Sequence, residues 1–162
     1  MIDIAELEIL MNTAAATILC GFVGLEREKK EKPAGLRTNM IVGSFSCLIV
    51  SLAIPLIDLI QNSELKDAVD SDPIRMLQAL VVGISFIGAG TIIKKKEEGV
   101  EGLTTAATLL YCLGIGISVA LEKFVIAVGI TILILLINNV FGGVKKRIVN
   151  NPEEKLTTKK SS

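Results

Sequence analysis

The distribution of charge along the chain constrains its fold more than any other feature. Of the 162 residues, 96 lie in five stretches without Asp, Glu, Lys or Arg, so all 34 charged residues share the other 66 positions. The stretches cover residues 9–25, 38–57, 76–93, 102–121 and 124–144. A helix needs about 20 mostly apolar residues to cross a bilayer, whereas a soluble helix of that length would carry a charged face. The sequence therefore predicts an all-α, polytopic membrane helix bundle with five transmembrane helices.

Basic residues predict how these helices are oriented. From the N-terminus onward, the six segments that flank the stretches contain 0, 5, 2, 3, 1 and 6 Lys or Arg residues. Because cytoplasmic loops are enriched in these residues, we expect an inner (plasma) membrane protein with its N-terminus outside and its C-terminus in the cytoplasm. Residues 1–8 contain three acids and no base, which is unlike a cleaved signal peptide. A transmembrane domain over 1–144 and a disordered polar tail over 145–162 are expected.

Composition argues against several functions. The 17 basic and 17 acidic residues give no basic excess, so no nucleic-acid partner is expected. The absence of histidine excludes a Ser-His-Asp triad, a Cys-His dyad and a His-ligated zinc site. Cys20, Cys47 and Cys112 show no CxxC spacing, which favours buried apolar thiols over a metal or redox site. No nucleophile–base pair can be assembled, and we expect neither an enzyme nor a bound cofactor.

The loop between the first two spans contains the first candidate site. Pro33 and Gly35 predict a turn there, because proline fixes φ and glycine accepts unusual dihedral angles. Thr38 and Asn39 follow at the start of the second span and are typical helix caps.

The charges of this loop fall into two groups. Arg37 could reach lipid phosphate, pair with Glu26, or bind an anion at the start of the second span. Glu26, Arg27 and Arg37 are close to helix ends and are candidates for a specific role. The other basic residues are interpreted as topology signals: Lys29, Lys30 and Lys32.

Small residues in the third span predict close helix packing. Gly83, Ser85, Gly88 and Gly90 would let another backbone approach, as membrane helices require when they associate. A break of the helix near residues 88–90, with its freed carbonyls facing protein or water, is the alternative.

Threonines begin the fourth span. Gly102 is expected to open this helix, and Thr104, Thr105 and Thr108 lie in its first turns. Such hydroxyls usually bond to carbonyls of their own helix or to a neighbouring helix. A hydroxyl-lined path for a solute is the functional alternative.

The loop between the second and third spans is acidic. Carboxylates suit Mg²⁺, so a weak external Mg²⁺ association is one interpretation of Asp67, Asp70 and Asp72, and a solvated loop is the other. None of the five stretches contains an Asp or Glu. Because cation conduits normally place carboxylates within the bilayer, this absence argues against a cation pump.

Three ordered segments carry a family resemblance. PAGLRTN, IGAGTI and GLTTAAT, between residues 24 and 118, resemble the signature blocks of the MgtC/SapB family, and the similarity covers residues 9–144. The resemblance implies functional importance for the positions that match these motifs and their flanks: Glu26, Arg27, Gly35, Leu36, Arg37, Thr38, Asn39, Arg75, Gly88, Gly90, Gly102, Thr104 and Thr105.

The resemblance also implies a cellular context. It implies a prokaryotic inner-membrane protein with four or five helices, linked to growth in low Mg²⁺, to survival in macrophages and to inhibition of the F-type ATP synthase. Many members carry a soluble ACT-like C-terminal domain, whereas 18 residues follow Val144 here, so regulation through such a domain is not expected. Leu110 and Tyr111 stand where the family pattern suggests a tryptophan.

Two functions remain open on the sequence. The first is a non-enzymatic accessory or regulatory protein that binds another membrane protein, or itself as a homo-oligomer, through small-residue helix faces. The second is a transporter or channel for Mg²⁺ or another small solute that uses Arg37 and the threonines of the fourth span.

Overall fold

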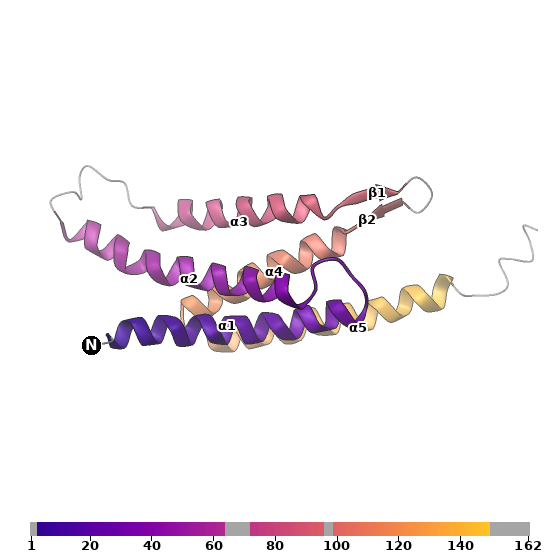
Figure 1. Cartoon of the computed structure of the whole chain (residues 1–162), viewed down its shortest axis with the longest axis horizontal. Coiled ribbons are helices and arrows are strands. Elements are labelled where there is room, and N and C mark those ends of the chain that lie inside the picture. Colours follow the sequence, from indigo (N-terminus) through magenta and orange to yellow (C-terminus); the bar gives the residue numbers. More distant parts are fainter. Residues whose placement is uncertain (1–2, 64–71, 96–98, 150–162) are drawn as a thin grey trace, which may run out of the picture.

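Five long helices make up most of the protein. The computed structural model describes residues 3–63, 72–95 and 99–149, with side chains for all of these except 95, 99 and 140–149. The helices are α1 (Ile4–Lys29), α2 (Leu36–Gln61), α3 (Pro73–Gly90), α4 (Leu103–Ala120) and α5 (Phe124–Val149). They run back and forth along one long axis, so that the α1–α2 loop and the end of α5 lie at the same end of the bundle (Figure 1). The N-terminus and the α4–α5 turn lie at the other end.

Length and apolarity fit a membrane. α1, α2, α3 and α4 are each long and apolar enough to span a bilayer, and the described apolar part of α5, Phe124–Asn139, is shorter. Many large apolar side chains point outward, such as Phe86 at 82% and Val125 at 88% exposure. Such a surface is compatible with lipid. The predicted polytopic helix bundle is confirmed, while its orientation and the fifth span stay predictions.

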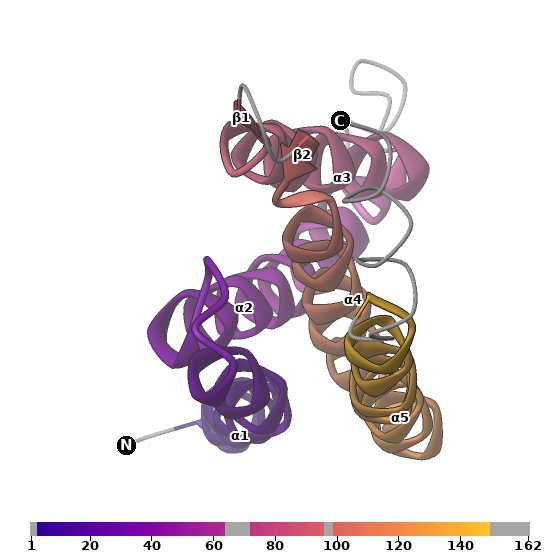
Figure 2. The same cartoon turned by 90° about the vertical axis from the view of Figure 1, so that its right-hand side faces the viewer.

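α4 is the central helix of the bundle. It contacts each of the other four helices, and Figure 2 shows it between α3, α2 and α5 when the bundle is seen end-on. Its side chains Leu109, Cys112 and Ile115 are completely buried, together with Cys20 of α1 and Cys47 of α2. The predicted burial of all three cysteines is therefore confirmed, and all three are free thiols.

Glycines allow α1, α2 and α4 to approach closely. A Cβ atom on Gly43 of α2 would overlap the Cys20 side chain of α1. A Cβ on Gly116 of α4 would overlap the carbonyl oxygen of Gly43 and lie 2.9 Å from the Cβ of Ser46. The tightest packing is thus where these three helices meet.

The segment between α3 and α4 differs from the prediction. The third span was expected over 76–93, but α3 covers Pro73–Gly90, and a hairpin of β1 (Ile93–Lys95) and β2 (Gly99–Glu101) follows. α3 begins earlier because Asp72 caps it with proline in its first turn. It is continuous to Gly90, where the Thr91 hydroxyl donates to the Gly88 carbonyl at 2.7 Å. The expected span 76–93 is therefore interrupted at Gly90, within the region 88–90 where the alternative placed a break, and its last residues form a turn and β1.

Candidate functional site

A buried arginine stands at the end of the bundle where α1 finishes and α4 begins. Arg27 is only 4% exposed, and its Nη2 donates to the Thr105 hydroxyl of α4 at 2.7 Å. Its Nε is buried without a hydrogen-bond partner among the described residues. Removing a charge from water costs several kcal/mol unless a counter-ion and hydrogen bonds compensate for it. Arg27 is therefore a costly residue whose position packing alone does not explain.

A polar cluster next to Arg27 links α1 to α5. Lys30 Nζ is 2.6 Å from Glu26 Oε1 and donates to the Asn138 carbonyl at 2.8 Å and to Asn139 Oδ1 at 3.0 Å. Asn138 Nδ2 donates to Glu26 Oε2 at 3.0 Å. Glu26 thus accepts a hydrogen bond through Oε2 and forms an ion pair through Oε1, which is buried without a hydrogen-bond partner among the described residues. Arg37 is not among these partners.

Sequence reasoning missed part of this cluster. The interpretation of Lys30 as a topology signal alone is wrong, because its ammonium group bonds to Glu26 of α1 and to the Asn138 carbonyl of α5 and so connects these two helices. The spacing of Glu26 and Lys30, four residues apart on one helix, was an available signal for an ion pair. The asparagines at 138 and 139 were a second signal, because polar side chains in an apolar helix are costly unless they have partners.

The start of α2 is built differently from the prediction. α2 begins at Leu36 with Gly35 as its N-cap, and the Leu36 amide donates to Glu28 Oε2 at 2.8 Å. A carboxylate from α1 therefore caps α2, and the prediction that Thr38 and Asn39 act as caps is wrong. A Cβ on Gly35 would lie 2.9 Å from the same Glu28 oxygen, so a larger residue here would displace the Glu28 carboxylate from the Leu36 amide.

Asn39 instead joins the loop to the bundle core. It is fully buried, and its Nδ2 donates to the carbonyls of Ala34 at 2.6 Å and Gly35 at 2.8 Å. Its Oδ1 accepts from the Cys112 thiol of α4 at 3.2 Å. One amide side chain thus fixes the predicted turn and connects it to the central helix.

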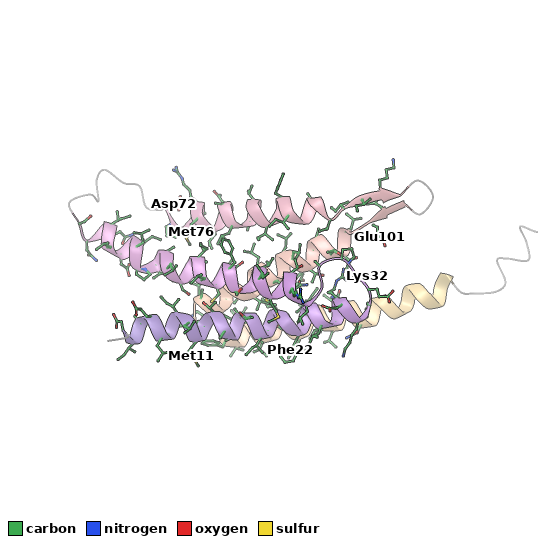
Figure 3. The ribbon with its side chains drawn as sticks, in the orientation of Figure 1. Met11, Phe22, Lys32, Asp72, Met76 and Glu101 are labelled. Atoms are coloured by element: carbon green, nitrogen blue, oxygen red, sulfur yellow. The ribbon has the colours of Figure 1, made fainter. Side chains whose placement is uncertain are left out.

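Other predicted positions lie apart from this site. Arg37 is exposed at the start of α2, and Arg75 lies at the opposite end of the bundle, with Nε 3.7 Å from Asp72 Oδ2. The Asp72 carboxylate also accepts from the Ile74 amide at 2.8 Å. Figure 3 shows the separation, with Asp72 at one end and Glu101 and Lys32 at the other.

The suggested Mg²⁺ ligands are only partly within the described structure. Asp67 and Asp70 lie outside the described residues, and Asp72 is the cap of α3. Within the described part of the chain, no group of three or more Asp, Glu or Cys side chains is arranged to hold a metal ion.

Of the three glycines predicted to pack in the third span, Gly88 alone contacts α4 closely. Gly88 is buried against Ala106 of α4, where an added Cβ would be 3.2 Å from the Ala106 Cβ. Gly83 and Gly90 have nothing within 4 Å of such an atom, so the predicted packing surface involves only one of the three glycines. The reason is that α3 lies on the outside of the bundle and contacts α4 along one side (Figure 2).

The threonines of α4 play different roles. Thr105 and Thr108 are buried, whereas Thr104 is exposed. The Thr108 hydroxyl donates back to the Thr104 carbonyl at 2.8 Å, as expected for a hydroxyl in an apolar helix. Thr105 faces α1 and accepts from Arg27. Gly102 opens the helix as predicted, with a left-handed φ of 94°.

Long apolar helices with a buried polar site at one end define a multi-pass helical membrane protein. Over residues 13–147 the chain matches the MgtC family. It therefore belongs to this family, as the three sequence motifs suggested.

Similar proteins come from several bacteria. The chain is 34% identical over 143 residues to protein MgtC of Salmonella typhimurium, covering 88% of this chain and 56% of the relative. It is 32% identical over 111 residues to protein SapB of Bacillus subtilis, covering 68% and 47%. It is 31% identical over 144 residues to YhiD of Escherichia coli, covering 88% and 65%. The chain thus spans about half to two thirds of the length of these relatives. No solved structure matches it.

Proposed function

We propose that this chain is a non-enzymatic accessory or regulatory protein of the inner membrane, linked to Mg²⁺ homeostasis, that acts by binding another membrane protein. Its N-terminus would lie outside the cell and its C-terminus in the cytoplasm. One contrast carries the proposal. Buried polar groups in the interior of the bundle bond to other groups of the same chain, whereas the outer helix α3 leaves most of its surface uncovered.

The interior of the bundle supports this function over transport. The buried hydroxyls of Ser46 and Thr131 donate to carbonyls of their own helices, at 2.6 Å and 2.7 Å. The charge-free stretches contain no carboxylate that could replace the hydration shell of a divalent cation. These polar groups therefore stabilise the helices, and they offer few ligands for a passing ion.

The surface of α3 supports a partner helix. Only Leu80, Ile84 and Gly88 of this helix are buried. The uncovered surface of α3 includes Gly83, with nothing within 4 Å of an added Cβ, and Phe86, which is 82% exposed. The glycine would let a partner helix approach the α3 backbone closely, and the neighbouring aromatic ring gives that helix a side chain to pack against. The partner would be the F-type ATP synthase, as the family resemblance suggests, or a second copy of this chain.

Site-specific crosslinking in native membranes tests this proposal. A photoreactive residue at position 83 of α3 should capture a discrete membrane protein, and capture should increase under Mg²⁺ starvation. Position 129 of α5 is the matched control, because Gly129 also has nothing within 4 Å of an added Cβ. Equal labelling from both positions, or none from position 83, would contradict the proposal.

Transport is the second candidate, favoured by one observation. The Escherichia coli relative YhiD is provisionally named a magnesium transporter, and both Arg37 and Thr104 are exposed here. In this case Arg37→Ala and Thr104→Ala should abolish Mg²⁺ uptake by proteoliposomes without lowering protein abundance. Absence of Mg²⁺ flux in wild-type proteoliposomes would instead support the accessory function.

A further inference from the structure

Oxygen atoms from two helices surround the ammonium group of Lys30. Its Nζ lies 2.6 Å from Glu26 Oε1 on α1, 2.8 Å from the Asn138 carbonyl oxygen and 3.0 Å from Asn139 Oδ1 on α5. A lysine ammonium has three hydrogens to donate, so three oxygens match its full donor capacity. These three oxygens therefore make up a cation-binding arrangement that the chain fills with its own side chain.

The carboxylate of this arrangement is held in place by a residue other than Lys30. Asn138 Nδ2 donates to Glu26 Oε2 at 3.0 Å, and the Glu26 side chain is only 9% exposed. The other oxygen, Oε1, is buried and accepts no hydrogen bond from the described residues. A buried carboxylate oxygen without a donor is costly, so this atom requires a positive charge beside it.

Distances and charge indicate which cation fits. The separations of 2.6 to 3.0 Å around Lys30 Nζ are longer than the roughly 2.0–2.1 Å that Mg²⁺ demands. Carbonyl oxygens replace the hydration shell of K⁺ in proteins, and two of the three oxygens here are of this type. Arg27 also interacts electrostatically with Glu26, so a divalent ion would leave a larger excess of positive charge in a poorly hydrated place. A monovalent cation about as large as an ammonium ion is therefore favoured.

The lysine can leave this position without disturbing the oxygens. Its side chain is 36% exposed, and Asn139 is also exposed. Lysine carries its charge on a flexible four-carbon stem, which can swing into water while Glu26 keeps its bond to Asn138. The α1–α2 loop and the end of α5 lie at this end of the bundle (Figure 1), so the oxygens are within reach of ions in solution.

We infer that Glu26, Asn138 and Asn139 form a site for a monovalent cation of the size of ammonium or potassium. Lys30 fills this site as a tethered ammonium ion, and a free ion fills it when the head of the lysine is withdrawn or removed. In both states the cation joins α1 to α5. This inference does not depend on the proposed partner.

Rescue by free cations tests the site. The Lys30→Ala variant of the full chain is purified in dodecyl maltoside micelles, and its thermal unfolding is followed at constant ionic strength. In tetramethylammonium chloride, whose cation is bulky and has no N–H donors, the midpoint should lie below that of the wild type. Ammonium or potassium chloride should raise the midpoint of the variant in a saturable manner and recover most of the difference, whereas the wild type should shift little.

The outcomes separate the possible ligands. A response to both ions indicates selection by size and charge, and a response to ammonium alone indicates that N–H donors are required as well. No response beyond that in tetramethylammonium, or a larger response to magnesium chloride at the same ionic strength, would overturn the inference.

Further variants locate the response. Lys32→Ala removes an exposed lysine from the same end of the bundle and should show no cation-specific shift. Adding Glu26→Gln to Lys30→Ala removes the negative charge of the site and should abolish the rescue. Lys30→Met keeps the apolar stem and repeats the test if Lys30→Ala does not fold. Equal responses in the two single alanine variants, or an undiminished response in the double variant, would contradict the site.

Discussion

Gly116 provides a sharp test of how the bundle is packed. An alanine Cβ at this position would lie 2.9 Å from the Ser46 Cβ and 3.0 Å from the Cys47 nitrogen, and closer still to the Gly43 carbonyl oxygen. Carbon atoms normally make contact at about 3.5–4.0 Å. Because two of these three neighbours are backbone atoms, no side-chain rotation relieves the overlap. We therefore expect Gly116→Ala to push α2 and α4 apart by roughly 1 Å, judged from these contact distances.

The cost of this displacement follows from two opposing effects. Overpacking a well-packed core costs about 1–3 kcal/mol, and a gap of about 1 Å forfeits up to roughly half of each lost dispersion contact. Replacing glycine by alanine within a helix contributes about 1 kcal/mol in the opposite direction. Backbone overlap places the cost at the upper end, so the free energy of unfolding should fall by about 2 kcal/mol.

Unfolding of the purified protein in mixed micelles, with increasing mole fraction of SDS, measures this change. Gly83→Ala is the matched control, because an added Cβ meets nothing within 4 Å on the open side of α3. It should be neutral or should stabilise by up to about 1 kcal/mol. If Gly116→Ala were as stable as Gly83→Ala, the close packing of α2 against α4 would be refuted.

Three further variants test the connections between helices, all with the same unfolding assay. Gly102→Ala places a side chain at a φ of 94° and against the Thr91 carbonyl, so a loss of at least about 1–2 kcal/mol is expected from the left-handed conformation alone; unchanged stability would contradict this turn. Asn39→Leu leaves the Ala34 carbonyl without this donor and the buried Cys112 thiol without its acceptor, while the Gly35 carbonyl keeps the backbone N–H of residue 39. The change should cost about 1–3 kcal/mol. Its control is Asn62→Leu, which removes an exposed bond to the Asp58 carbonyl and should have little effect. Lys30→Met should lower stability by about 1 kcal/mol because the α1–α5 link is lost. The control Lys32→Met changes an exposed lysine and should leave the stability unchanged. Equal losses of stability in the two lysine variants would contradict the contact between α1 and α5.

Much of the architecture could be predicted from the positions of the charges. Long charge-free stretches predict membrane helices because transfer of a charge into lipid is costly, and this argument needs no tertiary contact. Arg27 and Thr105 were each recognised as candidates, and their pairing across 78 residues was not. The same holds for Lys30 and Asn138, because the contact depends on how α1 and α5 are rotated about their axes.

The sequence by itself determined the class of this protein, the number of long helices and the family. Periodic patterning could not distinguish Gly116 and Gly43, which lie at helix contacts, from Gly83 and Gly90, which lie in open space, because all four occupy similar apolar surroundings in sequence. Only the tertiary structure decided which glycines allow close approach and which charges are buried. The physical reason is that these properties depend on distances between atoms of different helices, and a local sequence pattern does not specify them.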